Sequence, residues 1–113
     1  MIWAIIGCYA LAAVIGVTLA AARQKKQPLP TPVALAHGAL AGTGTVLLLV
    51  LVLRGVMPGL GVVALAIFAA AAVGGVMIFS TRFRQGAQAP MSMVVGHAVA
   101  AVTAFVLLLL VVL

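Results

Sequence analysis

Two histidines, His37 and His97, are the residues of this chain best suited to chemistry, because an imidazole can bind a metal, accept or donate a hydrogen bond, or carry a proton. They stand sixty positions apart in a sequence of 113 residues, of which 67% are hydrophobic and 5% are charged. A polar ring inside hydrocarbon is costly and indicates a functional site by default. Two such rings in matching surroundings predict one shared site.

The surroundings of the two histidines match over a long stretch. Residues 30–53 align without a gap with residues 90–113, and four of the identical pairs are Pro30 with Pro90, His37 with His97, Ala41 with Ala101, and Thr43 with Thr103. A weaker match, offset by one residue, links the preceding segments and pairs Tyr9 with Phe68 and Arg23 with Arg82. We therefore predict a tandem repeat of two helices, over residues 1–54 and 60–113.

Composition and segment length predict an all-α integral membrane protein. Each of four apolar segments has the roughly 20 residues that a helix needs to cross a bilayer core of about 30 Å; they cover residues 2–22, 32–53, 60–80 and 91–113. The segments lack the alternation of a membrane barrel strand, and backbone groups in lipid must be satisfied internally. Since the connections are short, we predict a single membrane domain over residues 1–113, folded as a four-helix up-down bundle.

The distribution of charge predicts the orientation in the membrane. The chain has six Lys and Arg residues and no Asp or Glu. Five of the six cations stand in the first and third connections, namely Arg23, Lys25, Lys26, Arg82 and Arg84. The positive-inside rule places these connections in the cytoplasm and both termini outside. The expected location is the bacterial inner membrane, with a multi-pass topology.

The positions of the histidines along their helices predict that both rings lie at one level in the cytoplasmic leaflet. Each follows the prolines that open its helix by five to seven residues, or roughly 8–10 Å along the axis. The second and fourth helices of an up-down bundle are diagonal, so the rings would face each other across its centre. Small residues near them allow close helix approach or leave room for a flat group; these are Gly16, Gly44, Gly74, Gly75 and Ala101.

A haem fits this set of residues. Imidazoles are common axial ligands of haem iron, and His37 and His97 would hold the iron from opposite sides. The two haem propionates need cations. Arg23, Arg82 and Arg84 are expected at the same end of the bundle, and the chain has no carboxylate to compete for them.

This layout resembles the two-histidine b-type membrane cytochromes, such as the cytochrome b of quinol-oxidising respiratory complexes. In that architecture a four-helix bundle holds haem between histidines on its second and fourth helices, with glycines on the first and third, here Gly16 and Gly74 with Gly75. The resemblance implies one haem b bound by His37 and His97. This chain departs from the family in one respect, because those cytochromes usually hold two haems with four histidines.

Several alternatives remain at this stage. A duplicated interior histidine could serve only as a hydrogen-bonding group between helices. A divalent metal held by two imidazoles alone would be under-ligated. The single Cys8 excludes an intrachain disulfide and a multi-cysteine metal site. The chain offers no set of nucleophile, base and orienting group, so no catalytic residue and no enzyme activity are expected.

Two functions follow from the sequence. The first is a single-haem b-type membrane cytochrome that transfers electrons near the cytoplasmic face. The second is a cofactor-free accessory subunit of a larger membrane complex. Membrane lipid surrounds the chain in both cases, and no nucleic acid is expected. The sequence leaves open a quinone, a redox protein, a larger complex or a homodimer as the partner.

Overall fold

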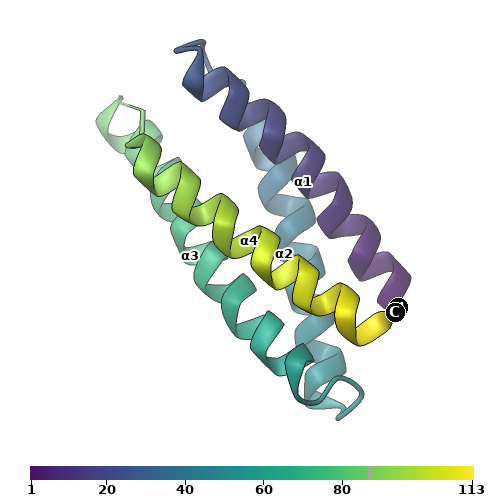
Figure 1. Cartoon of the computed structure of the whole chain (residues 1–113). Helices are drawn as coiled ribbons and strands as arrows, with labels where there is room; N and C mark the ends of the chain where they lie inside the picture. Colours follow the sequence, from purple (N-terminus) through teal and green to yellow (C-terminus); the bar gives the residue numbers. More distant parts are fainter. Residues whose placement is uncertain (87) are drawn as a thin grey trace.

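The structure, a computed structural model of the chain, is a bundle of four α-helices (Figure 1). Helix α1 spans Ile2–Gln24, α2 spans Thr31–Leu53, α3 spans Leu60–Gln85 and α4 spans Met91–Val112. The structure describes residues 1–86 and 88–113, without the side chains of residues 83–85. Within these residues there is no strand. The predicted all-α four-helix bundle is confirmed.

Proline and glycine set the helix boundaries. Pro30 and Pro90 are the N-cap residues of α2 and α4, where a missing N–H costs little. The third helix runs five residues beyond the apolar segment that ended at residue 80 in the sequence-based prediction. It ends before Gly86, whose φ of 61° suits a left-handed cap. Hydropathy thus predicted the apolar span of α3, whereas the glycine determines where its helix stops.

Each of the four helices is long and apolar enough to cross a membrane. The longest dimension of the bundle, 42 Å, lies along the helices. Large apolar side chains cover the outside, among them Val17 at 69% exposure and Leu53 at 77%. Such a continuous apolar exterior matches a lipid environment and not water. These properties indicate an integral membrane protein.

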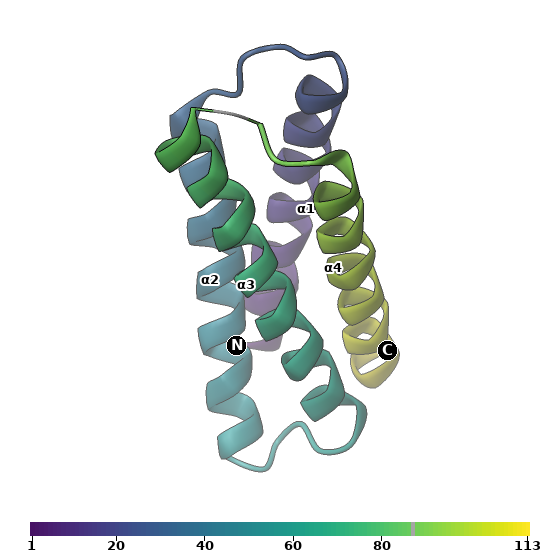
Figure 2. The same ribbon diagram turned by 90° about the vertical axis from the view of Figure 1, so that its left-hand side faces the viewer.

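The four helices form two hairpins (Figure 2). Helix α1 packs along α2, and α3 packs along α4, while the hairpins meet more sparsely along α2–α3 and α1–α4. Within the described residues the diagonal pairs, α1 with α3 and α2 with α4, make no close backbone contact. The α1–α2 and α3–α4 connections lie at one end, which we call the loop half; the termini and the α2–α3 turn lie in the other, the terminal half.

The well-packed core lies in the terminal half. Ile5, Leu48 and Leu108 are the largest fully buried side chains. Tyr9 and Phe68 stack between the hairpins, with ring centroids 3.8 Å apart and planes inclined by 5°. The loop half buries little more than the alanines at positions 12, 71 and 89. The bundle is therefore tight at one end and loosely filled at the other.

The two hairpins make equivalent contacts. The burial class of each residue over 31–48 repeats position by position over 91–108. In α1 and α3 the buried residues recur with an offset of 59 positions, so Ile5 corresponds to Ala64, Tyr9 to Phe68 and Ala12 to Ala71. Below, residues related by 60 positions in α2 and α4, or by 59 in α1 and α3, are called equivalent.

Candidate functional site

Both histidines point into the bundle and bond to the neighbouring helix of their own hairpin. Nδ1 of His37 lies 2.8 Å from the carbonyl oxygen of Ala12, and Nδ1 of His97 lies 2.7 Å from that of Ala71. A carbonyl oxygen can only accept, so each Nδ1 carries the proton and donates it. The neutral ring then has a free lone pair on Nε2, the form in which imidazole binds a metal.

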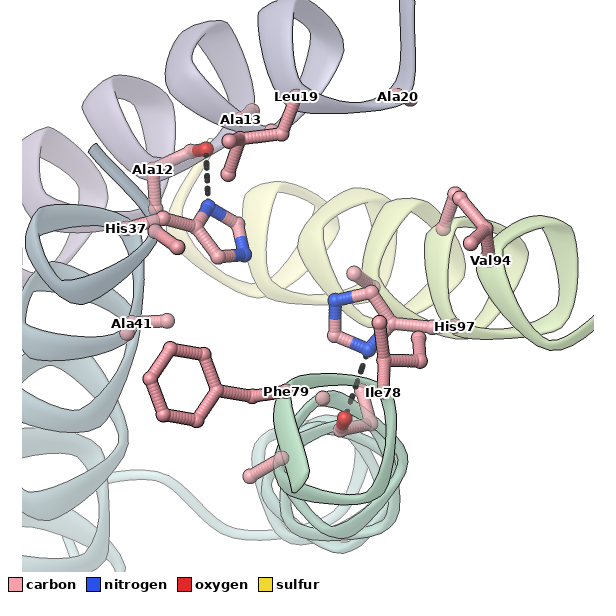
Figure 3. Close-up of a pocket in the computed structure, with 18 of the residues that line it drawn as sticks. Ala12, Ala13, Leu19, Ala20, His37, Ala41, Ile78, Phe79, Val94 and His97 are labelled. Atoms are coloured by element: carbon pink, nitrogen blue, oxygen red, sulfur yellow. Dashed lines mark hydrogen bonds between the residues drawn. The ribbon is translucent and has the colours of Figure 1, made fainter. Parts of the chain in front are cut away.

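The two imidazoles face each other across the bundle (Figure 3). Their ring centroids are 6.0 Å apart, and the ring planes are inclined by 71°. Figure 3 shows the nitrogen of each ring that is not bonded to a carbonyl turned toward the other ring. In the described part of the chain these Nε2 atoms make no hydrogen bond with each other. Two unused lone pairs therefore converge on one point between the hairpins.

Glycines on α1 and α3 make room for the rings. A Cβ built on Gly16 would lie 3.0 Å from Cε1 of His37, and one on Gly75 would lie 3.1 Å from Cε1 of His97. Because both positions are glycine, each imidazole lies directly against the neighbouring helix and reaches its carbonyl. Gly16 and Gly75 thus position the histidines, and the space that they provide is filled by imidazole.

Replacing Gly16 with alanine is therefore expected to displace the His37 ring by a few tenths of an ångström and to weaken its bond to Ala12. For the haem site expected from the sequence, loss of such a supporting contact to a ligating histidine lowers affinity by about tenfold or more. Gly75→Ala should act equally on His97. The measurement is a haemin titration of the purified variants. Gly7→Ala on α1 is the control, because its Cβ meets nothing within 4 Å; equal affinity of Gly16→Ala and Gly7→Ala would contradict the positioning role.

A cavity of about 800 Å³ surrounds the facing nitrogens. All four helices line it, mainly with alanine, glycine and valine. The Tyr9–Phe68 stack and Phe105 bound it toward the terminal half. A volume of 300–1,000 Å³ and a largely apolar wall with a few convergent polar groups are typical of a cofactor or ligand site. The cavity lies where the hairpins separate, with one histidine on each side.

Two arginines bridge the hairpins at the loop end of this cavity. Nε of Arg23 on α1 donates to the carbonyl oxygen of Ala89 at 2.9 Å, and Nη2 of Arg82 on α3 contacts the hydroxyl of Thr31 at 3.3 Å. Both arginines line the cavity. Among the described residues, Nη1 of Arg82 is buried without a hydrogen-bond partner. A buried donor without a partner is costly, so this nitrogen is suited to an acceptor that the described residues do not supply.

The remaining residues predicted from the sequence have varied positions. Ala101 lines the cavity. Gly44 does not line the cavity. A Cβ built on it would lie 3.1 Å from Cζ of Tyr9, so this glycine lies against the ring of Tyr9. Gly74 makes only ordinary contact with His97 and is also outside the lining. These two glycines give clearance to side chains, because Tyr9 and His97 occupy the space beside them. The side chain of Arg84 lies outside the described residues.

Sequence reasoning missed the partners of the histidines, the carbonyls of Ala12 and Ala71. A carbonyl has no signature in a sequence, although the offset alignment of the first and third helices placed these two alanines at equivalent positions. It also missed the bond between the Tyr9 hydroxyl and Thr45 Oγ1, at 3.0 Å. The equivalent pair is Phe68 and Phe105, so only one hairpin has this polar contact.

No family model matches this sequence, and no curated protein and no solved structure was found to be similar to it. The described residues contain no group of three or more His, Cys, Asp or Glu side chains that could hold a metal ion. The fold and the site together define a four-helix membrane bundle in which two equivalent imidazoles face an apolar cavity.

Proposed function

We propose that this protein is a membrane cytochrome that binds one b-type haem between His37 and His97. The spacing of the imidazoles carries the proposal. With metal–nitrogen bonds of about 2 Å, two imidazoles that hold one metal atom from opposite sides have ring centroids about 6 Å apart. The observed separation of the two centroids is 6.0 Å. The described chain supplies only these two nitrogens, a set that suits a metal whose other ligands come from a macrocycle.

The shape of the site favours a flat group over a bare ion. The cavity of about 800 Å³ is far larger than an ion needs, and it lies between two hairpins that each present one Nε2. Many side chains at the wall are small, as at Ala41, Ala72 and Ala101. A planar ring inserted between the hairpins would bury both of its faces against apolar walls, which is how proteins hold haem in a site of low polarity.

The charges at the loop end match the carboxylates of a haem. Arg23 and Arg82 line the cavity, and Nη1 of Arg82 has no acceptor among the residues that the structure describes. The whole chain has no Asp or Glu. Hydrogen bonds from arginine to a carboxylate, whether single or bidentate, are stronger than hydrogen bonds between neutral groups. We infer that these two arginines bind the propionates, with Arg84 as a further cation at the same end.

Bound haem supplies a one-electron couple, and the surrounding residues determine how that couple is used. His37 and His97 hold the iron on both sides, so no open position remains for a substrate, and the protein is an electron carrier without enzyme activity. The haem lies near the cationic loop end. By the positive-inside rule this end faces the cytoplasm of a bacterial inner membrane. The protein exchanges electrons with a redox protein or a quinone there.

Replacing Arg82 with glutamine is expected to lower haem affinity by about tenfold to 100-fold, because a hydrogen bond to a charged group contributes about 1.5–3 kcal/mol. The geometry at the iron should be unchanged, so the absorption spectrum of the bound haem should match that of the wild-type protein. The measurement is a haemin titration followed in the Soret band. The control is Lys25→Gln, because Lys25 is exposed and lies in the α1–α2 connection, at the same end of the bundle as Arg82. Equal loss in both variants would indicate an unspecific effect of net charge.

The proposal is tested by purifying the protein in mild detergent from haem-replete cells. The expected result is one haem per chain and, after reduction with dithionite, a sharp Soret band and α-band of a six-coordinate b-type haem. A colourless protein that takes up no added haemin would contradict the proposal. If that colourless protein copurified with a large complex in fixed ratio, it would be an accessory subunit.

A further inference from the structure

The wall of the cavity is nearly twofold symmetric. Both hairpins run in the same sense and repeat the same burial pattern, so an approximate twofold axis runs along the bundle between them. Most residues of one hairpin that line the cavity recur at equivalent positions of the other. Several of these pairs consist of identical residues, among them Gly16 with Gly75, Arg23 with Arg82, and Ala41 with Ala101.

The groups that would hold a haem are divided equally between the hairpins. His37 and His97 lie on opposite sides of the axis, and each donates to the carbonyl oxygen of an equivalent alanine. Arg23 and Arg82 bridge the hairpins at the loop end, one from each side. An iron held by the two imidazoles, and a pair of propionates held by the two arginines, would therefore be centred on this axis.

A haem b has an approximate twofold axis of its own, which passes through the iron and between the two propionates. A half-turn about this axis returns the iron and the propionates to equivalent places. It exchanges a methyl group with a vinyl group at two pairs of positions, all on the half of the ring away from the propionates. When the axis of the haem coincides with that of the bundle, the two orientations make the same bonds to the histidines and the arginines.

The equivalent pairs that differ do not all make the same side of the cavity narrower. The side between α2 and α3 combines one large residue with two glycines, whereas the side between α1 and α4 has three residues of small or medium size. These residues are Phe79, Gly38 and Gly42 on the first side, and Ala20, Ala98 and Val102 on the second. The two sides differ in shape but carry a similar bulk of side chains.

One further pair differs where the cavity meets the terminal half. Thr45 on α2 corresponds to Phe105 on α4, and both line the cavity. This end would face the half of the haem that carries the methyl and vinyl groups, so the pair distinguishes the two orientations. Methyl and vinyl differ by one carbon atom, and the burial of one carbon group changes an equilibrium ratio by less than tenfold. The preference for one orientation is therefore limited.

From these features we propose that the site binds haem in two orientations, related by a half-turn about the bundle axis, and that both are populated at equilibrium. This inference rests on the proposed haem binding. Ala41 and Ala101 lie one helical turn deeper than the histidines, on the same face of their helices. A larger side chain at Ala41 meets a methyl group in one orientation and a vinyl group in the other, and at Ala101 it meets the reverse.

The test is proton NMR of the oxidised, haem-loaded protein in detergent, recorded once the spectrum no longer changes with time. Each orientation gives its own set of strongly shifted ring-methyl resonances. The wild-type protein should give two sets, in a ratio no greater than about tenfold, equivalent to about 1.4 kcal/mol. Ala41→Val should shift this ratio by about threefold, the order expected for one carbon group, and Ala101→Val should shift it by a similar factor in the opposite direction.

The control is a synthetic haem whose methyl and vinyl groups are arranged symmetrically about the axis between the propionates. A half-turn leaves this haem unchanged, so the wild-type protein should give a single set with it, and this comparison needs no variant. A single set from natural haem would overturn the two orientations. Two sets from the symmetric haem would also overturn them, because the heterogeneity would then belong to the protein.

The two alanine variants test the shared axis separately. Shifts of the ratio in the same direction in Ala41→Val and Ala101→Val, or no shift in either, would overturn the equivalence of the two sides of the bound haem. In each of these cases haem binding itself would still stand. A wild-type protein that binds no haem would refute both proposals.

Discussion

Replacing His97 with alanine is expected to abolish stable haem binding, and His37→Ala should do the same. Removing a group that merely supports a metal-binding histidine costs about 10–100-fold in affinity, so losing a ligand itself should cost at least about 100-fold. The two effects should be nearly equal, because both rings have the same bond to a carbonyl and the same glycine behind them. The measurement is a haemin titration of each purified variant.

Thr103→Ala is the appropriate control for these variants. Thr103 lies on α4 close to the site in sequence, but its hydroxyl bonds to the carbonyl oxygen of Val99 in its own helix and its side chain is exposed. This variant should bind haem as the wild-type protein does. Wild-type affinity in either histidine variant would show that the facing rings have only a structural role.

Replacing Tyr9 with alanine is expected to have the largest effect on stability, a loss of at most about 3–5 kcal/mol, the range for large buried aromatic side chains in water-soluble proteins. Tyr9 is 5% exposed and stacks on Phe68 across the two hairpins. In lipid the driving force is close packing of atoms and not exclusion of water, so the cavity left by the ring accounts for the loss. The free energy of unfolding in mixed micelles would measure it.

Tyr9→Phe separates the stacking from the hydrogen bond. This variant keeps the ring and loses only the contact with Thr45, whose hydroxyl still donates to the carbonyl oxygen of Ala41. Hydrogen bonds between membrane helices contribute about 0.6 kcal/mol on average, and the loss should be of that order. If both variants lost the same stability, the contact between the hairpins would depend on the hydroxyl and not on the stack.

Much of the architecture could be predicted from the sequence. Apolar segments of membrane-spanning length gave the number of helices, because lipid leaves a backbone few other ways to satisfy its hydrogen bonds. The prolines before α2 and α4 marked the starts of these helices. The end of α3 was missed by five residues, since a polar helical turn beyond the apolar segment has no hydropathy signal.

The site could be predicted only in part. His37 and His97 stood out because an ionisable ring in hydrocarbon is rare, and the structure brings them together. The sequence did not show which group each glycine contacts. Gly16 and Gly75 lie against imidazole rings, and Gly44 lies against the ring of Tyr9. A glycine indicates close approach, but its sequence position does not say which group approaches.

The most direct test of the central claim is low-temperature electron paramagnetic resonance of the oxidised, haem-loaded protein. Two imidazoles on one ferric iron give a low-spin signal, and steeply inclined ring planes make it strongly anisotropic. With the planes at 71°, we predict a strongly anisotropic low-spin signal that is lost in His37→Ala and in His97→Ala. A high-spin signal in the wild-type protein, or a low-spin signal that survives in both variants, would contradict the assignment of these histidines as the two axial ligands.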